Sequence, residues 1–282
     1  MNTLETNFLL LFLSYNSKDP SCYRINDADV MTEHSNESAV RELAAYLQKR
    51  SQKIDKIFLF SSQATKKLLK NADMTTVDFF KRRIKEFVTA ENIITVDYDE
   101  SNSMNAALPD IGEMGKSILA EAEKIQREQG ADCPITIHAD MTGGMRNASM
   151  MMLGVMRLLN FSGLQMGRIL YSNWEPNRSS NFVEDSQDVY RFFDLVAGAT
   201  EFAKYGSVEK LADYYKIDVL EQKPYTAECN LSRELYELVN AMGYFAQSIK
   251  LCRYGDLEDA CALLAKKIQA FTNLAPQNYD AN

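Results

Sequence analysis

The chain has 282 residues, of which 46% are hydrophobic, so it is long enough for one large domain or for one domain plus a smaller one. Its formal net charge is −8 and it has no block of basic residues, which disfavours general binding to duplex nucleic acid. The five cysteines are scattered without a CxxC pair, which fits a reducing cytoplasm and argues against a zinc site or a disulfide scaffold.

Up to residue 193 the chain alternates short apolar runs with amphipathic patterns. The apolar run at residues 8–13 predicts a strand buried on both faces; it is too short to span a bilayer and lacks the basic flank of a signal peptide. Further strands are predicted at residues 54–60, 93–98, 135–138, 166–172 and 189–193, with a short strand or hairpin arm at 22–30. Helices are predicted at residues 37–50, 65–70, 76–89, 111–128 and 147–160. This rhythm predicts an α/β fold with a Rossmann-like, mostly parallel sheet and helices on both faces.

After residue 193 the composition changes, and we expect a small all-helical C-terminal region. Its helices are predicted at residues 194–249, with breaks near Gly206 and Pro224, and at 257–271. We place the two domains at residues 1–200 and 201–282. The second is too small for an independent enzyme but adequate as a dimerisation element or as a connector to an effector outside this chain. Alternatively, these helices simply cover one edge of the sheet.

Polar clusters follow four of the predicted strands, at residues 14–17, 61–63, 140–146 and 172–174. In a doubly wound sheet, ligands bind outside the carboxyl ends of the strands, so these clusters are expected to line one rim. No GxGxxG follows the first strand and no GxxxxGK[ST] loop is present, which disfavours ordinary NAD and P-loop sites.

The most informative cluster runs from Asp140 to Arg146, between a predicted strand and a predicted helix. The first N–H groups of a helix lack internal partners, and Gly143 and Gly144 permit positive φ and a close ligand, so this turn is a candidate anion site. The helix dipole disfavours Arg146 there by about 0.3–1 kcal/mol, and a bound phosphate would reverse that effect. The rival interpretation is a solvated arginine on a tight turn, with Asp140 capping the helix. Turn geometry alone leaves the two interpretations about even.

Other single residues also have two interpretations. Trp174, the only tryptophan, is placed for base stacking, although packing at a rim is at least as common. His138 lies within a predicted strand, and we expect a packed, hydrogen-bonded histidine rather than a base. His34 lies in a polar loop with no partner visible in the sequence.

Three stretches resemble the CRISPR-associated Rossmann-fold (CARF) family over roughly residues 1–200. Residues 12–16 read Phe-Leu-Ser-Tyr-Asn, like the family's first strand-end loop, and residues 55–64 are similar to its second strand and following turn. The most specific stretch is residues 137–146, which resembles the family's strand followed by Asp-x-Thr-x-Gly-x-Arg. Position 143 is Gly where many relatives carry His or another residue.

The resemblance implies a homodimeric receptor for a cyclic oligoadenylate, the second messenger of type III CRISPR antiviral defence, with cyclic tetra-adenylate or hexa-adenylate as ligand. The phosphates would contact Gly143, Gly144 and Arg146. The adenine edges would be read by Asn16, Gln63 and Asn173, and the bases would stack on Trp174 or Tyr15. We expect no cofactor, no metal, no duplex nucleic acid and no membrane. The expected ligand-binding residues are Ser14, Tyr15, Asn16, Ser61, Ser62, Gln63, Asp140, Met141, Thr142, Gly143, Gly144, Met145, Arg146, Asn147, Asn173 and Trp174.

The sequence names no catalytic residue. Many relatives carry a helical ribonuclease domain with an Arg-x-x-x-x-His motif, which both histidines here fail to match. We therefore expect a sensor that allosterically regulates an effector. The alternatives are a ring nuclease using Arg146, Thr142 and Lys66, which lacks a good general base, and a nucleotide-responsive transcriptional regulator, which the acidic charge disfavours.

Overall fold

The computed structural model describes residues 5–15, 20–69, 73–99, 107–130, 133–144, 147–176, 178–220, 224–226 and 231–273. The chain divides into two compact units, Met1–Gln187 and Asp188–Asn282. The boundary near residue 200 expected from the sequence falls inside a helix, α5 (Gln187–Tyr205), whereas the structure divides the chain at the start of that helix.

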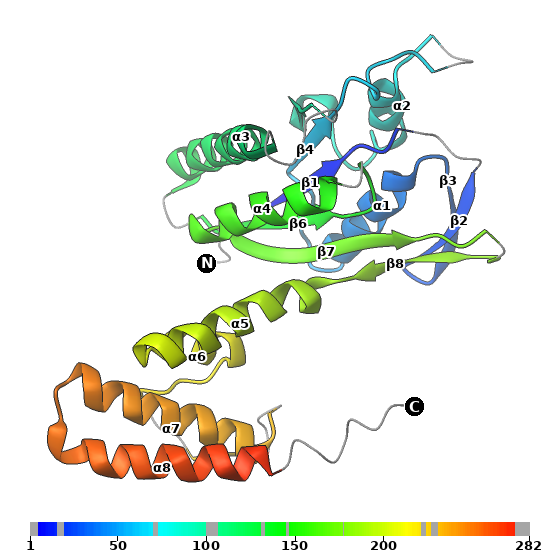
Figure 1. The fold of residues 1–282 in the computed structure, drawn as a ribbon. Helices are drawn as coiled ribbons and strands as arrows, with labels where there is room; N and C mark the ends of the chain where they lie inside the picture. Colours follow the sequence, from blue (N-terminus) through cyan, green and yellow to red (C-terminus); the bar gives the residue numbers. More distant parts are fainter. Residues whose placement is uncertain are drawn as a thin grey trace. The chain divides into compact units, whose positions relative to one another are not determined.

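The first unit is built on one sheet, in which the described strands follow the order β3-β2-β8-β7-β6-β1-β4-β5 (Figure 1). Five neighbouring strands are parallel, as the predicted Rossmann-like fold requires. These strands are β1 (Thr6–Phe12), β4 (Lys56–Ser61), β5 (Ile93–Asp97), β6 (Ile135–Asp140) and β7 (Gln165–Asn173). The order reverses between β1 and β6, which makes this the topological switch point.

β1 is buried along its whole length because helices cover both faces of the sheet. On one face, Leu9 and Leu11 pack with Leu43 of α1 (Ser35–Gln48) and Phe80 of α2 (Thr76–Arg83). The opposite face carries α3 (Ala107–Gln129) and α4 (Ala148–Phe161). These two helices pack closely, since a side chain at Gly115 would collide with Leu158.

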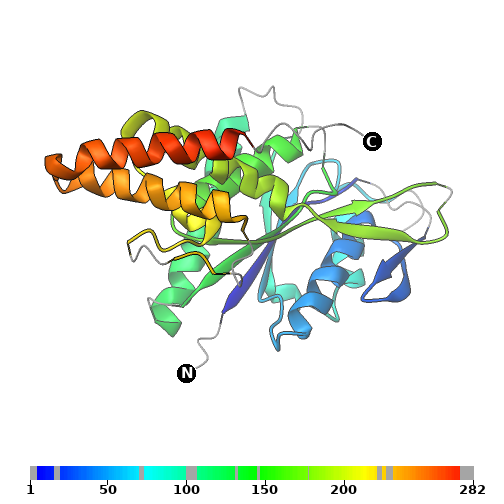
Figure 2. The same cartoon turned by 90° about the horizontal axis from the view of Figure 1, so that it is seen from below.

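The antiparallel extension of the sheet was only partly predicted. The region at residues 22–30 forms a hairpin of β2 (Ser21–Ile25) and β3 (Ala28–Thr32), which lies beyond β8 in Figures 1 and 2. Asn26 and Asp27 form its turn with φ of 49° and 64°, as a two-residue hairpin turn requires. β8 (Asn181–Asp185) was missed, because its sequence Asn-Phe-Val-Glu-Asp is short and polar.

Two predicted elements were wrong. Residues 189–193 are not a strand but part of α5, because Val189, Phe192, Phe193 and Val196 recur at helical spacing, not alternating spacing. Residues 65–69 form turns and an isolated bridge instead of a helix. Thr75 and Asp78 form a capping box that starts α2 at residue 76, and a 3-10 turn, Ala90–Asn92, follows that helix before β5.

The second unit is helical in its described part, as predicted. Its helices are α5, α6 (Glu209–Tyr215), α7 (Arg233–Lys250) and α8 (Tyr254–Thr272). The break expected near Gly206 is present, with φ of +68° at that glycine. α7 and α8 form a helical hairpin in which Leu238 and Ala241 contact Leu264. Within the described ranges, no helix has both the length and the apolar character needed to span a bilayer.

Leu43→Ala tests the core between α1 and the sheet. Leu43 has no exposed surface, so the cavity left by truncation should lower the free energy of unfolding by about 2–5 kcal/mol. Urea unfolding followed by the fluorescence of Trp174, which lies in the first unit, measures this change. Gln48→Ala on the exposed side of the same helix is the control and should change it by less than about 0.5 kcal/mol; equal midpoints for the two variants would contradict the packing described here.

Candidate functional site

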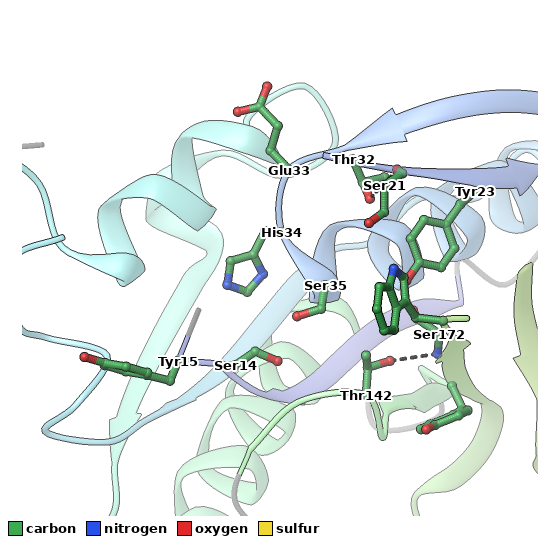
Figure 3. A pocket seen from close by; sticks show the side chains of 12 residues that line it. Ser14, Tyr15, Ser21, Tyr23, Thr32, Glu33, His34, Ser35, Thr142 and Ser172 are labelled. Atoms are coloured by element: carbon green, nitrogen blue, oxygen red, sulfur yellow. Dashed lines mark hydrogen bonds between the residues drawn. The ribbon is translucent and has the colours of Figure 1, made fainter. Parts of the chain in front are cut away.

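A cavity of about 440 Å³ lies at the carboxyl ends of the strands beside the switch point. The segments after β1, β6 and β7 form one side of it, and the β2–β3 hairpin and the start of α1 form the other (Figure 3). Its lining residues are Ser14, Tyr15, Ser21, Tyr23, Thr32, Glu33, His34, Ser35, Thr142, Tyr171, Ser172 and Trp174.

The side chain of Asn36, in the first turn of α1, joins the ends of β1 and β6 behind this cavity. Its Nδ2 donates to the Phe12 carbonyl at 3.1 Å and to Asp140 Oδ2 at 2.7 Å. Its Oδ1 accepts from the Ser14 backbone N–H at 3.0 Å. All of these groups sit where strand pairing ends, so Asn36 supplies the hydrogen bonds that the ladder cannot.

Asp140 is fixed by the same set of bonds. Its Oδ1 accepts from the Thr142 backbone N–H at 2.8 Å, and it is almost fully buried. Burial raises the pKa of the Asp140 carboxyl to about 6, against the opposing hydrogen bonds from Thr142 and Asn36. Asp140 does not cap α4, whose N-cap residue is Asn147 and has no side-chain capping bond. The carboxylate holds the turn and α1 together instead.

The paired glycines have a packing reason. A side chain at Gly143 would collide with the Phe12 carbonyl and with Asn36, so it is the protein's own backbone that approaches this residue closely. Gly144 has φ of +91°, and a side chain there would collide with Ala148. Gly144 is exposed, whereas Gly143 is buried. Of the two, only Gly144 presents backbone to the surroundings.

Four of the predicted ligand-binding residues, Ser14, Tyr15, Thr142 and Trp174, line the cavity together. They come from three of the four strand-end clusters that were expected to line one rim. Thr142 Oγ1 also accepts from the Ser172 backbone N–H at 2.9 Å, which fixes the ends of β6 and β7 relative to each other.

The other described candidates lie outside the cavity lining. Ser61 and Ser62 are buried at the end of β4, where Ser61 bonds to Thr65, and Gln63 is exposed beside them. Asn173 donates to Glu184 on β8. The other described candidates of the segment that follows β6 are also outside the lining: Asp140, Met141, Gly143, Gly144 and Asn147. Asn16, Met145 and Arg146 fall outside the described residues.

Sequence reasoning missed the side of the cavity formed by α1 and the hairpin. A polar run of His34, Ser35 and Asn36 ahead of an amphipathic helix is a helix-start signal, and it could have drawn attention to this end of α1. The hairpin residues Ser21, Tyr23 and Thr32 carried no such signal, because their place at the cavity depends on the pairing of β2 with β8.

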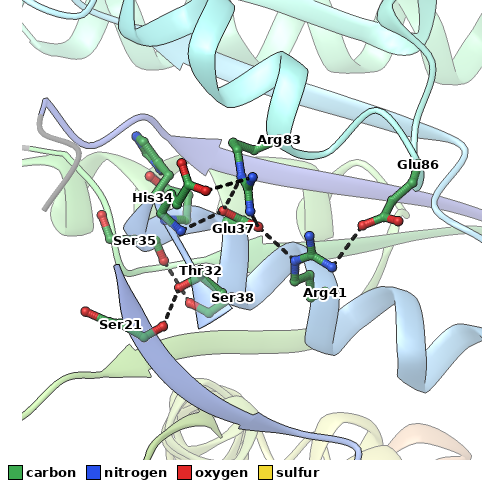
Figure 4. Close-up of polar contacts among 11 residues, drawn as sticks. Ser21, Thr32, His34, Ser35, Glu37, Ser38, Arg41, Arg83 and Glu86 are labelled. Atoms are coloured by element: carbon green, nitrogen blue, oxygen red, sulfur yellow. Dashed lines mark hydrogen bonds and ion pairs between the residues drawn. The ribbon is translucent and has the colours of Figure 1, made fainter. Parts of the chain in front are cut away.

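An ion-pair network around the buried Glu37 supports this side (Figure 4). Glu37 has no exposed surface and accepts from Arg41 Nε at 2.9 Å and from Arg83 Nη2 at 2.9 Å. Burial alone would raise the pKa of Glu37, but hydrogen bonds from Arg83, the Glu33 backbone and Arg41 lower it overall. Arg83 also pairs with Glu33 at 3.0 Å, so the acidic residue of the cavity lining shares this cation with Glu37.

The described lining suits a ligand that presents a flat polar group. It contains hydroxyls, one imidazole and four aromatic side chains, of which Tyr15 and Trp174 are 58% and 41% exposed. Glu33 is the one formally charged side chain in this lining. In the described part of the chain, no group of three or more His, Cys, Asp or Glu residues is arranged to hold a metal ion.

No protein-family model and no curated protein matches this sequence. Among solved structures, Enterococcus italicus Csm6 bound to cyclic hexa-2'-fluoro-hexa-dAMP is similar with a TM-score of 0.42 and 12% sequence identity. The match covers 88% of this chain and 55% of that chain, so the present chain spans about half the length of that protein. Similarity of this degree assigns no ligand to the cavity.

Asn36→Ala tests the connection between the strand ends. The change leaves the Ser14 N–H, the Phe12 carbonyl and the Asp140 carboxylate without this partner, and each buried unsatisfied group costs about 1–3 kcal/mol. We expect the free energy of unfolding to fall by at least about 2 kcal/mol in urea titrations followed by Trp174 fluorescence. Asn173→Ala, which removes an exposed amide bond to Glu184, should change it by less than about 1 kcal/mol. A smaller effect at residue 36 than at residue 173 would refute this account.

The pH dependence of stability should reflect three buried groups. Burial lowers the pKa of His34 and of His138 from 6.5 to about 4, so the unfolded chain takes up these protons first and stability is lost as the pH falls from about 6.5 to about 4. Asp140 acts oppositely between about pH 4 and 6, because its raised pKa lets the folded state bind a proton first. The stability lost through the two histidines exceeds the stability gained through Asp140, so the free energy of unfolding should fall as the pH is lowered from 6.5 to 4.5. Urea midpoints measured at both pH values check the sign, and an increase at the lower pH contradicts it.

Proposed function

We propose that this chain is a cyclic oligoadenylate-binding sensor module of type III CRISPR defence. The observation that carries the proposal is the cavity at the switch point, where Ser14, Tyr15, Thr142 and Trp174 meet. Two of the three stretches that resemble CARF domains contribute to the described lining, through Ser14 and Tyr15 and through Thr142. Aromatic faces for stacking beside hydroxyls for edge contacts are the usual means by which proteins hold unpaired bases.

The size of the cavity supports a shared ligand. About 440 Å³ is near the lower end of the range of small-molecule pockets, which is roughly 300–1,000 Å³. One such cavity has room for a nucleotide-sized group and not for a ring of four or six adenylates. A ring with two-fold symmetry would be held by two copies of this chain, each offering the same loops. The homodimer is part of the proposal for this reason.

The phosphates of the ring would lie beside the turn that follows β6. Gly144 offers an exposed backbone there, and the sequence places Arg146 two residues later, at the approach to α4. Arginine grips phosphate oxygens in a bidentate fork, and the first N–H groups of α4 add unpaired donors.

A route for the signal follows from the chain path. β7 ends at the cavity, β8 pairs with it in the antiparallel sense, and α5 begins at Gln187 directly after β8. A ligand shifts a conformational equilibrium only if it binds one state better than the other. We therefore propose that the second unit differs between the free and the bound states and passes that difference to an effector.

Binding without cleavage is favoured by the described site. His34 Nδ1 accepts a hydrogen bond from the Asn36 backbone N–H, which occupies the lone pair that a general base would need. Asp140, whose pKa burial raises to about 6, does not line the cavity. Chromatography of cyclic tetra-adenylate after prolonged incubation with the protein separates the two functions, and linear products would establish a ring nuclease.

Arg146→Ala tests the ligand site directly. Loss of a charge-assisted contact should cost about 1.5–3 kcal/mol per site, so two symmetric copies should weaken ring binding by orders of magnitude in isothermal titration. The melting temperature should stay within a few degrees of wild type. Arg127→Ala on α3, where the side chain is 75% exposed, is the matched control and should bind as wild type does.

If Arg146 is only a solvated residue on the turn, Arg146→Ala should leave the affinity for the ring unchanged. Its melting temperature should then equal that of wild type or be slightly higher, because an unfavourable contact with the helix dipole is lost. Absence of binding of both cyclic tetra-adenylate and cyclic hexa-adenylate at micromolar wild-type protein would overturn the proposed function itself.

A further inference from the structure

Arg168 on β7 joins the helix that begins at the cavity to the strand that precedes α5. Its Nη1 donates to Glu42 of α1 at 3.0 Å, and its Nε donates to Asp185, the last residue of β8, at 2.7 Å. The guanidinium also lies over the ring of Tyr46 on α1, 4.6 Å from its centroid. Two side chains of α1, one helical turn apart, therefore hold the same guanidinium.

This ion pair is largely enclosed by the protein. The side chain of Arg168 is 14% exposed, and its backbone N–H donates to Nδ1 of His138 on the neighbouring strand at 2.9 Å. Exposed ion pairs contribute little because water and salt screen them, and a partly buried pair is screened much less. The carboxylates of Glu42 and Asp185 contact different donors of one planar, rigid guanidinium, which fixes their positions relative to each other.

Asp185 extends this connection to the start of α5. Its Oδ1 accepts from the backbone N–H of Gln187, the first residue of α5, at 3.0 Å, and from that of Ile169 at 3.3 Å. The first N–H groups of a helix need partners from outside the helix, and a carboxylate there also suits the helix dipole. The Asp185 carboxylate is thus shared between Arg168 and the beginning of α5.

The other end of the connection lies at the cavity. α1 begins at Ser35, which lines the cavity, and Glu42 follows about two turns along the same helix. A helix is rigid over so short a span, so a displacement of its first turn also displaces Glu42. Hydrogen bonds therefore connect a cavity-lining helix, through Glu42, Arg168 and Asp185, to the first N–H of α5.

We propose that Arg168 is a positioning residue that couples the occupancy of the cavity to the geometry at the start of α5. This inference rests on the proposed function, because it names a route by which the sensor signals. Ligand contacts at the first turn of α1 bias the position of Glu42, and the guanidinium of Arg168 passes that bias to Asp185. Because α5 continues into the second unit, this bridge of side chains acts beside the backbone route along β7 and β8.

Two variants interrupt the bridge with little change in side-chain size. Arg168→Lys keeps the positive charge, but a single ammonium does not reproduce the separate contacts of the guanidinium with two carboxylates. Glu42→Gln removes the charge on α1 and leaves Arg168 and Asp185 in place. Glu184→Gln is the matched control, because it makes the same change beside Asp185 on β8, where the exposed side chain accepts from Asn173.

The measurement is hydrogen exchange of the α5 amides in the full chain, with and without a saturating amount of the cyclic oligoadenylate that wild type binds. In wild type and in Glu184→Gln, the ring should change the exchange rate at the start of α5 by about fivefold or more, the usual scale of an allosteric coupling. In Glu42→Gln and Arg168→Lys this change should shrink to less than about twofold, while isothermal titration still shows that the ring is bound. Melting temperatures report whether each variant is folded.

A bridge that serves only stability gives a different result. It lowers the melting temperatures of both variants but leaves the ligand-induced change in exchange as large as in wild type, and that outcome overturns the role of Arg168. A ring-bound wild type with unchanged exchange in α5 overturns it as well, while ring binding itself still stands. If Arg168→Lys fails to fold, Glu42→Gln decides alone. Failure of wild type to bind either ring overturns the proposed function and this inference together.

Discussion

The connection of the β1 and β6 ends through Asn36 is the interaction on which the candidate site depends. At the carboxyl end of a parallel sheet the strands stop, and their last N–H and C=O groups need partners that the ladder no longer supplies. The single amide of Asn36 serves the Ser14 N–H, the Phe12 carbonyl and the Asp140 carboxylate. Its position is in turn set by α1, which brings His34 and Ser35 to the cavity.

This arrangement makes the first turn of α1 unusually enclosed. Asn36, Glu37 and Ser38 have no exposed surface, although the start of a helix is ordinarily solvated. Each of the three has a specific partner. Asn36 bonds to the ends of β1 and β6, and Glu37 pairs with Arg41 and Arg83. Ser38 shares a hydrogen bond of 2.7 Å with the hydroxyl of Ser172. Burying such groups is costly unless their hydrogen bonds are met, so this layer specifies one geometry more than it adds stability.

The two histidines show how one residue type serves two purposes in one sheet unit. His138 bridges β1 and β7 with both ring nitrogens paired, as expected of a structural histidine. His34 accepts from the start of its own helix through Nδ1, and its ring also meets the Ser14 backbone at the end of β1. Burial keeps both rings neutral near pH 7, so the difference between them lies in hydrogen bonding and not in charge.

The sequence by itself determined the local elements and their class. Continuous apolar runs such as residues 8–13 identified the buried parallel strands, and helical spacing identified α1, α3, α4 and the C-terminal helices except the start of α5. The strand-end rule gave a longer set of candidates, of which Ser14, Tyr15, Thr142 and Trp174 line the cavity. Tertiary structure alone decided which strand ends adjoin. Because β1 lies between β4 and β6, the turn after β6 meets the start of α1, while Ser61 and Ser62 are buried away from the cavity. The hydrogen bond between Asn36 and Asp140 joins residues 104 positions apart in the sequence. No local sequence pattern predicts such a pair, because periodicity indicates which face of an element is buried but not which element it is buried against.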